Sequence, residues 1–379
     1  MDERKTHLDF VRGMAAVAVS LSHLRNFFFV DYSQVINPNL FDKFFYFITG
    51  FGHAAVMIFF VLSGYFIGGA VYTRIKEHRW SWVDYGISRL ARLWTVLIPA
   101  LLLTLMWDFL GMHLHGIGGY DGRFGDLIHS GPNALAPINL SVSCFLGNVF
   151  FLQTIKCPIF GTNGPLWSLA YEFWYYLLFP LAFFMVVHYD TFKRRVLAGI
   201  IFCIIFLFLP KIILVDGIIW LMGFFSFYIC GLNNLAKTIV KHPFFFILAL
   251  FLFISSMLIA RKEHSNYSDC YIGIAFTCMM PFLSVNQSNI AIYKWISEKL
   301  SSISYTLYLV HFPILGFIFF VYRLPNRSQP TIGNIIFCLF LYSTILIYGW
   351  FVWFFFENKT PMVRTFIKEN IFKSECNYL

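Results

Sequence analysis

The feature that most constrains this chain is a series of apolar segments of about 20 residues, each long enough to cross a bilayer as an α-helix. Only 12% of the 379 residues are charged, about half of the share in soluble domains. A water-soluble core cannot accommodate 48 Phe, 20 Tyr and 10 Trp, so we predict an all-α, polytopic membrane protein. About ten transmembrane helices are expected, near residues 8–30, 53–73, 90–110, 166–187, 195–214, 217–236, 243–260, 270–286, 302–322 and 332–356.

The distribution of charge predicts the orientation of these helices. Most of the 28 Lys and Arg lie in segments on the same side as the N-terminus, which indicates that both termini are cytoplasmic. The net charge of +9 therefore reflects membrane topology rather than nucleic-acid binding. No small-residue cleavage pattern ends the first apolar run, so the first helix is expected to remain as an anchor. We predict one ten-helix membrane domain over residues 1–358, followed by a cytoplasmic amphipathic tail over 359–379.

Residues 111–165 form the one long extracytoplasmic loop in this prediction. Within it, the apolar stretch 143–152 is too short to span a membrane, so it is expected to dip back or lie on the surface. Cys144 and Cys157 both lie in this loop, where a disulfide is one option in an oxidising compartment. Spacing alone does not decide whether they pair.

Two ionisable residues lie on one face of the first predicted helix. The eleven-residue step from Arg12 to His23 is about three helical turns, which places both side chains on one face and roughly 16 Å apart along the axis. Such residues in an apolar helix are costly unless they face a polar interior. Individually, Arg12 could pair with Asp9 and His23 could bond to a neighbouring helix. The occurrence of both residues on one face favours a functional role for that face.

A second basic pair begins the third predicted helix. Arg89 and Arg92 are three residues apart, so both guanidinium groups lie on one side of the helix. The fixed fork of donors in arginine suits phosphate oxygens, although anchoring at the cytoplasmic interface explains such a pair equally well. Arg12 has the same predicted depth, so the three arginines could converge on one polyanion at the cytoplasmic face.

Glu172 on the fourth predicted helix has the same predicted depth as His23. A carboxylate beside a histidine fixes its tautomer and raises its basicity, which is what a general base needs. The alternative is a structural Glu172 paired with Arg25. His311 on the ninth helix is expected to lie beside the substrate in a supporting role, since a lone histidine in a bundle is more often a hydrogen-bond donor than a catalyst.

Trp167, Ser168 and Tyr171 adjoin Glu172 and would suit a sugar-binding rim, although Trp and Tyr also occur in interfacial belts. His113 and His115 lack supporting ligands, so no metal is expected. The predicted site has an arginine cluster at the cytoplasmic face and a histidine near the outer face, and one arginine of the cluster lies on the same side of the first helix as this histidine. A donor with a phosphate head group and a long arm, such as acyl-CoA, would fit this arrangement. Its phosphates would contact the arginines while the pantetheine arm carries a thioester towards His23.

At these residues the sequence closely resembles the acyltransferase-3 family of bacterial membrane O-acyltransferases. The matching segments are LDFVRGMAAVAVSLSH (8–23), FFVLSGYFI (59–67), RLARLWTVLIPALLL (89–103), GPLWSLAYEFWYYLLFPL (164–181) and SYTLYLVHFPI (304–314). They extend in order over most of the chain, and their joint occurrence is specific, whereas a single piece such as Arg-x-x-Arg is not.

The resemblance implies a ten-helix enzyme of the bacterial inner (cytoplasmic) membrane that transfers an acyl group, usually acetyl, from cytoplasmic acyl-CoA. The acceptor would be a hydroxyl of an extracytoplasmic or lipid-linked glycan, such as O-antigen lipopolysaccharide or a related surface polysaccharide. By position, His23 looks like the catalytic residue, and Glu172 looks like a further site residue. His23 would act either as the general base for direct transfer, which is favoured, or as a brief carrier of the acyl group. The donor-binding set would be Arg12, Arg89 and Arg92.

Two alternatives from other classes also use polar residues inside a helix bundle. A glycolipid transporter or flippase often has internal repeats and paired broken helices, and neither is clear here. An O-antigen polymerase acts on diphosphate-linked substrates outside the membrane, and would be expected to have arginines in the outer loop. Residues 111–165 contain only Arg123 and Lys156 as basic residues, which favours a cytoplasmic donor.

Overall fold

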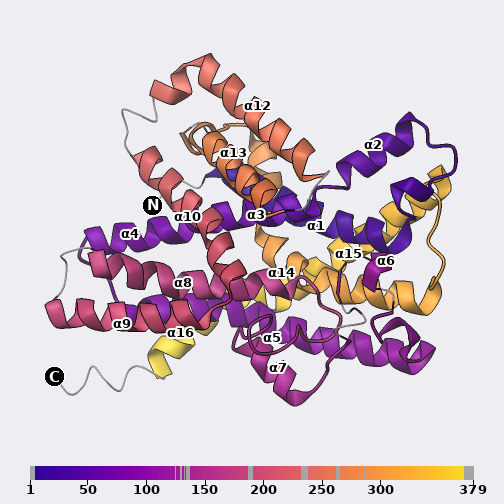
Figure 1. Cartoon of the computed structure of the whole chain (residues 1–379), viewed down its shortest axis with the longest axis horizontal. Helices are drawn as coiled ribbons and strands as arrows, with labels where there is room; N and C mark the ends of the chain where they lie inside the picture. Colours follow the sequence, from indigo (N-terminus) through magenta and orange to yellow (C-terminus); the bar gives the residue numbers. More distant parts are fainter. Residues whose placement is uncertain are drawn as a thin grey trace. The chain divides into compact units, whose positions relative to one another are not determined.

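The structure is a computed structural model that describes residues 5–123, 125–128, 130–131, 133, 137–186, 191–231, 238–261, 265–285 and 287–370. Over these ranges the chain forms helices and loops and no β-strand, so the all-α prediction is confirmed (Figure 1). Each of the ten predicted membrane segments corresponds to a helix or continuous helical run. These are α1 (Thr6–Phe28), α3 (Gly52–Ser63) continued through the π-helical turn η2 (Gly64–Gly68) into α4 (Gly69–Lys76), α5 (Trp82–His115), α8 (Leu166–Val186), α9 (Phe192–Phe208), α10 (Lys211–Gly231), α12 (Pro243–Ala260), α13 (Asn266–Val285), α14 (Ala291–Tyr322) and α15 (Ile332–Phe355).

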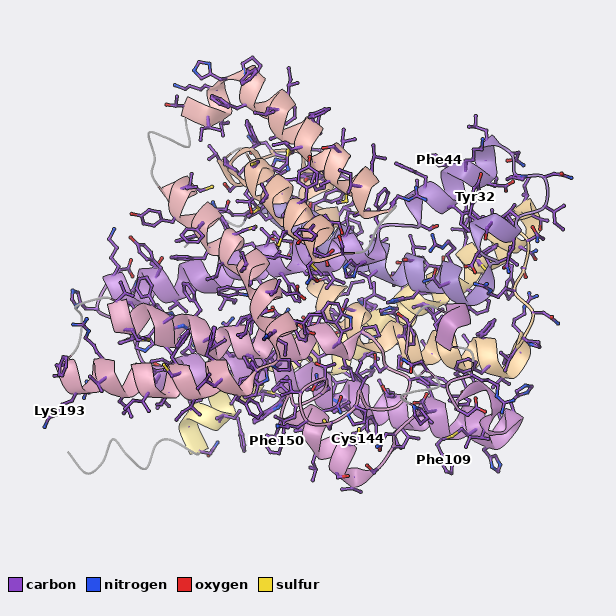
Figure 2. The ribbon with its side chains drawn as sticks, in the orientation of Figure 1. Tyr32, Phe44, Phe109, Cys144, Phe150 and Lys193 are labelled. Atoms are coloured by element: carbon purple, nitrogen blue, oxygen red, sulfur yellow. The ribbon has the colours of Figure 1, made fainter. Side chains whose placement is uncertain are left out.

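Eight of these runs in the described part of the chain are long and apolar enough to cross a membrane. The two outside this group are α9, which has 17 residues, and α1, which carries Asp9, Arg12, His23 and Arg25 in an otherwise apolar sequence. Outward-facing phenylalanines are consistent with lipid contact, since Phe109 and Phe150 are 66% and 57% exposed and are labelled at the margin of the ribbon in Figure 2. The chain is a multi-pass membrane protein.

The predicted boundary between the fifth and sixth helices is wrong. The sequence prediction continued the fifth helix to residue 214, but α9 ends at Phe208 and α10 begins at Lys211. Pro210 between them cannot donate a backbone hydrogen bond and clashes with the preceding turn, so it ends one helix. Its carbonyl accepts from the backbone N–H groups of Ile213 and Leu214, and it thereby opens the next. The predicted fifth and sixth helices are therefore displaced relative to the real ones.

The chain divides into two compact units, each assembled from three stretches. The first unit contains residues 1–15, 51–80 and 168–301, and the second contains residues 16–50, 81–167 and 302–379. Because the stretches alternate along the sequence, no single linker separates the units.

In the first unit, α10 packs directly against α3 and η2, and α13 contacts α10, α3 and α12. Two glycines permit the close approach of α3 and α10. A Cβ at Gly64 would lie 1.8 Å from the carbonyl oxygen of Trp220, and one at Gly223 would lie 1.9 Å from that of Val61. Small residues of this kind let helix backbones approach closely in membranes, where apolar packing replaces the hydrophobic effect.

We expect Gly223→Ala to destabilise the first unit by about 1–3 kcal/mol, because the added methyl group meets a backbone carbonyl that cannot rotate away. Thermal unfolding of the purified protein in detergent measures this loss. Gly86→Ala on α5 is the matched control, since a Cβ at Gly86 would meet nothing within 4 Å. Equal unfolding temperatures for the two variants would contradict the close packing of α3 and α10.

In the second unit, α5 contacts the short helix α7 (Val142–Val149) and the C-terminal helix α16 (Thr360–Asn370). The predicted short apolar stretch 143–152 thus begins as a helix too short to span a membrane. Within the predicted tail, α16 forms one ion pair with α5, between Lys368 and Asp84. The last part of that tail, residues 371–379, lies outside the described residues.

A buried polar network ties the end of the outer loop to the helices of the second unit. The Asp108 carboxylate on α5 is fully buried and accepts hydrogen bonds from the backbone N–H and the hydroxyl of Thr162, at 2.8 and 2.7 Å. The Asn163 side-chain amide donates to the Thr104 hydroxyl and to the Leu309 carbonyl. These bonds fix the loop beside the part of α14 that carries His311.

Candidate functional site

Two histidines from helices α1 and α14 meet inside the second unit. The Nδ1 atom of His23 lies 2.8 Å from the Nε2 atom of His311, and the two rings are nearly parallel, at 12°. The His311 side chain is completely buried, and its Nδ1 atom lies 2.8 Å from the backbone carbonyl of Leu307. We call His23 and His311 the histidine pair. Residues 288 positions apart in the sequence are thus joined by one hydrogen bond.

The backbone carbonyl of Leu307 determines which nitrogens carry protons when both rings are neutral. A carbonyl can only accept, so Nδ1 of His311 carries the proton and donates it to Leu307. Nε2 of His311 then has a lone pair and accepts from Nδ1–H of His23. Nε2 of His23 is consequently unprotonated. The pair therefore presents one basic nitrogen, and this nitrogen can take a proton from a hydroxyl.

The outer loop contributes a hydroxyl group beside this basic nitrogen. The hydroxyl of Ser130 lies 3.5 Å from Nε2 of His23. The next residue, Gly131, has a φ of +79°, and a Cβ there would lie 3.2 Å from both the Phe312 ring and the Thr162 carbonyl oxygen. The turn thus requires glycine. The Phe312 ring also lies edge-on to His23, with ring centroids 5.0 Å apart.

Glu172 on α8 belongs to a different hydrogen-bond network, within the first unit. Its carboxylate accepts a hydrogen bond of 2.6 Å from the Ser63 hydroxyl and another from the Tyr176 hydroxyl. Ser63 in turn accepts from the indole N–H of Trp220 at 3.1 Å. Within the first unit, donors from α3 and α8 therefore orient the carboxylate. From the sequence, the predicted partner of Glu172 was His23, and the alternative partner was Arg25. Both of these residues belong to the second unit.

The three residues predicted as a sugar-binding rim all lie on α8. Trp167 is half-buried and belongs to the second unit, whereas Ser168 and Tyr171 are buried in the first. The Tyr171 ring stacks on Phe60 of α3, with centroids 6.4 Å apart and an interplanar angle of 16°. The rim residues thus share one helix with Glu172.

Arg12 forms an ion pair with Asp9, which was the alternative to a functional role in the sequence analysis. One guanidinium nitrogen lies 3.0 Å from the Asp9 carboxylate and also donates to the hydroxyl of Ser301 on α14. The Ser301 hydroxyl donates to the same carboxylate at 3.0 Å. About a third of the Arg12 side chain remains exposed, so a fixed guanidinium group is still accessible to a ligand.

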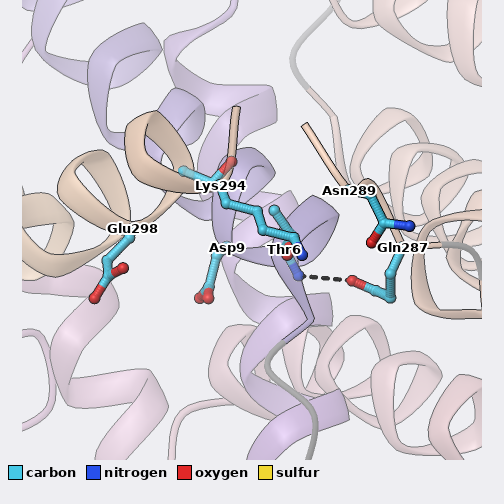
Figure 3. A pocket seen from close by; sticks show the side chains of 7 residues that line it. Thr6, Asp9, Gln287, Asn289, Lys294 and Glu298 are labelled. Atoms are coloured by element: carbon cyan, nitrogen blue, oxygen red, sulfur yellow. Dashed lines mark hydrogen bonds between the residues drawn. The ribbon is translucent and has the colours of Figure 1, made fainter. Parts of the chain in front are cut away.

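A polar pocket of about 300 Å³ lies next to this ion pair, within the first unit (Figure 3). Asp9 is shared between the pocket and the Arg12 ion pair. The Thr6 backbone N–H donates to the Gln287 side chain across the pocket at 2.9 Å, and Lys294 contributes a positive charge to its wall. The other lining residues are Asn289, Ser297 and Glu298. All seven lining residues have polar or charged side chains.

Arg89 and Arg92 lie on α5 in the second unit, and each is held by neighbouring groups. The Arg89 guanidinium group donates to the Ser88 hydroxyl at 3.1 Å. Arg92 lies 2.6 Å from the carboxylate of Glu357, which is almost completely buried and lies two residues after the end of α15. The backbone N–H and hydroxyl of Thr306 also donate to that carboxylate. Glu357 therefore orients Arg92 while 39% of the arginine side chain stays exposed.

Cys144 and Cys157 are free thiols in this structure. Both sulfurs lie near the side-chain amide nitrogen of Asn148, at 3.6 and 3.8 Å. Burial raises the pKa of the Cys144 thiol to about 11 and also raises the pKa of Cys157. Both thiols are therefore protonated at neutral pH.

Sequence reasoning missed Ser130, Ser63, Ser301 and Glu357. Ser63 lies inside the FFVLSGYFI segment, where a polar residue in an apolar run was a usable signal. Glu357, a lone carboxylate at the end of the last predicted span, was another. Ser130 and Ser301 gave none, because serines are common in loops and at helix surfaces.

A multi-pass set of apolar helices with a hydrogen-bonded histidine pair is an integral membrane protein with a candidate general base. The family model described as an acyltransferase domain matches residues 6–354. The chain therefore belongs to the acyltransferase-3 family and is a membrane acyltransferase. No curated protein and no solved structure shows significant similarity to it.

Proposed function

We propose that this acyltransferase moves an acyl group, acetyl in the first instance, from cytoplasmic acyl-CoA to a hydroxyl of an extracytoplasmic or lipid-linked glycan. The observation that carries the proposal is the histidine pair, which leaves Nε2 of His23 as a proton acceptor in a member of an acyltransferase family. O-acyl transfer needs a base that removes the proton from an attacking hydroxyl, and a positioned imidazole supplies it. O-antigen and related surface polysaccharides of a bacterial inner-membrane pathway are the proposed acceptors.

The proposed donor site uses the three arginines predicted from the sequence. Arg12 is held by Asp9 and Ser301, and Arg92 is held by Glu357, whose carboxylate also accepts from Thr306. Each arginine keeps part of its side chain exposed. A guanidinium group has five N–H donors, so an anchored arginine can still bind phosphate oxygens. Arg89 adds a further cation on α5. The positive-inside pattern assigns these residues to the cytoplasmic side, where acyl-CoA is made.

The proposed acceptor site uses the residues of α8. The oriented Glu172 carboxylate can accept hydrogen bonds from sugar hydroxyls, and Trp167, Ser168 and Tyr171 are its neighbours on the helix. A half-buried indole ring such as that of Trp167 offers an apolar face to a pyranose ring. In this proposal, the shape of the rim determines which sugar binds and which of its hydroxyl groups is acylated.

Mass spectrometry of surface glycan from cells with and without the gene tests the proposal. The expected result is a mass increase of one acetyl group per modified sugar, present only with the intact gene. A different added acyl mass would change the donor and retain the enzyme class. Unmodified glycan of altered length or altered export would contradict O-acyl transfer and favour the polymerase or flippase.

Glu357→Gln is expected to raise the KM for acyl-CoA about ten-fold or more, because Arg92 loses the charged partner that orients it. Arg89→Ala and Arg92→Ala should raise the same KM. Steady-state kinetics with varied acyl-CoA measure the change, with Lys368→Ala as the control, since its ion pair with Asp84 is partly exposed. Unchanged donor KM in all three variants would contradict the arginine donor site.

A further inference from the structure

One hydroxyl of this chain occupies the position next to the basic nitrogen of the histidine pair. Ser130 lies 3.5 Å from Nε2 of His23, which carries no proton when both histidines are neutral. The serine hydroxyl can therefore only act as the donor in this contact. This distance is longer than a strong hydrogen bond, as is common for catalytic pairs before substrate binds.

We propose that Ser130 is the nucleophile of this enzyme and carries the acyl group as a serine ester between donor and acceptor. The inference rests on the proposed function and specifies the route of the acyl group within it. A series of contacts leads from the Ser130 hydroxyl to His23, from His23 to His311, and from His311 to the Leu307 carbonyl. In this series Ser130 has the place of a nucleophile and His23 that of its base. His311 orients His23 and is itself fixed by the carbonyl of Leu307. Nucleophilic hydroxyls in proteins are activated by this arrangement on unrelated folds.

The local backbone supports the assignment of Ser130. The serine precedes Gly131, whose positive φ and close contacts with Phe312 and Thr162 allow no side chain. A Cβ at Gly164 would lie 2.9 Å from the Gly131 backbone nitrogen, so the turn also packs against the start of the α8 segment. The Thr162 backbone is fixed in turn by the buried Asp108 carboxylate. These contacts hold the backbone directly after Ser130 in place.

A covalent intermediate also suits two substrates that approach from opposite sides of a membrane. In direct transfer, the thioester and the glycan hydroxyl must occupy one site at the same time. With a serine ester, each substrate needs to reach Ser130 only in its own half-reaction. The kinetic consequence is a ping-pong mechanism.

Both half-reactions balance with His23 as the only proton carrier. In the first, the Ser130 Oγ–H proton moves to Nε2 of His23 and Oγ attacks the thioester carbonyl. The C–S bond breaks, and the thiolate takes the proton from His23 to leave as free coenzyme A. In the second, the glycan hydroxyl gives its proton to His23 and attacks the serine ester. The bond from the acyl carbon to Oγ breaks, and Oγ recovers the proton.

The test uses the purified full-length protein in detergent and acetyl-CoA labelled in its acetyl group, without acceptor. After an acid quench, the protein is expected to retain label on the peptide that contains Ser130, and hydroxylamine should release it. Ser130→Ala should lose both this label and at least 99% of glycan acetylation. Ser130→Cys should form a thioester, which neutral hydroxylamine cleaves faster than the oxygen ester.

Ser143→Ala is the matched control, because this serine is exposed on α7 and its hydroxyl hydrogen-bonds to that of Ser141, away from the histidine pair. It should keep both label and transfer. Label on another residue, or wild-type glycan acetylation by Ser130→Ala, would overturn the serine intermediate and leave the proposed function intact. Label on Ser130 with no glycan acetylated in cells would support the serine ester while removing the proposed acceptor.

Discussion

His23→Ala is expected to lower acyl transfer by about 10²–10⁴-fold, the usual contribution of a positioned general base. The substitution removes the only basic nitrogen that the histidine pair presents, while His311 keeps its bond to the Leu307 carbonyl. The remaining hydroxyl groups must then lose their protons without help. O-acetyl content of surface glycan, measured in a strain that lacks the chromosomal gene, reports the effect.

The control for this prediction is His113→Ala, which changes an exposed histidine on α5. Both variants should accumulate in the membrane at the wild-type level, because neither change enlarges a side chain or exposes a charge. If His23→Ala retained more than a tenth of the wild-type acetylation, His23 would not be the base.

Replacing His311 is expected to have the second-largest effect, because His311 selects the tautomer of His23. In His311→Leu, Nδ1–H of His23 loses its acceptor, and the ring gains by moving its proton to Nε2, where it blocks proton transfer. Losing a tautomer-fixing partner costs catalytic triads about 10⁴-fold. A similar range of about 10²–10⁴-fold is expected here. The rate of acetylation by purified enzyme measures it.

His311→Gln provides the informative comparison. The amide oxygen of glutamine can still accept from Nδ1–H of His23, so this variant should retain more activity than His311→Leu. The KM values for both substrates should stay near those of the wild type, since His311 acts through His23. Equal loss in the two variants would indicate that His311 serves packing rather than orientation.

The fold was largely predictable because length and apolarity determine membrane helices. Ten apolar segments correspond to ten helices. The boundaries are wrong where apolarity continues across a break, and where a helix continues into polar sequence, as at α14, which begins at Ala291 instead of the predicted residue 302. At the break between α9 and α10, Pro210 lacks a backbone donor and Lys211 adds a charge, but the apolar residues on either side extend the predicted segment across both. The interleaving of the two units depends on tertiary contacts that no local pattern records.

The candidate site was predictable where a polar residue carries a cost. Arg12, His23 and Glu172 stand out because a charge or imidazole inside an apolar segment needs a partner. The identity of each partner was not predictable in the same way. His311 joins His23 over 288 positions, and Ser130 reaches it from a loop with no periodicity.

The most direct test of the central claim is acyl transfer by the purified protein in proteoliposomes. Labelled acetyl-CoA is supplied on the face that carries the termini, and a lipid-linked glycan is supplied in the same membrane. We predict that label appears in the glycan with the wild-type protein and is reduced at least a hundred-fold with His23→Ala. Equal labelling by both proteins, or no labelled glycan with the wild type, would contradict a His23-dependent membrane O-acyltransferase.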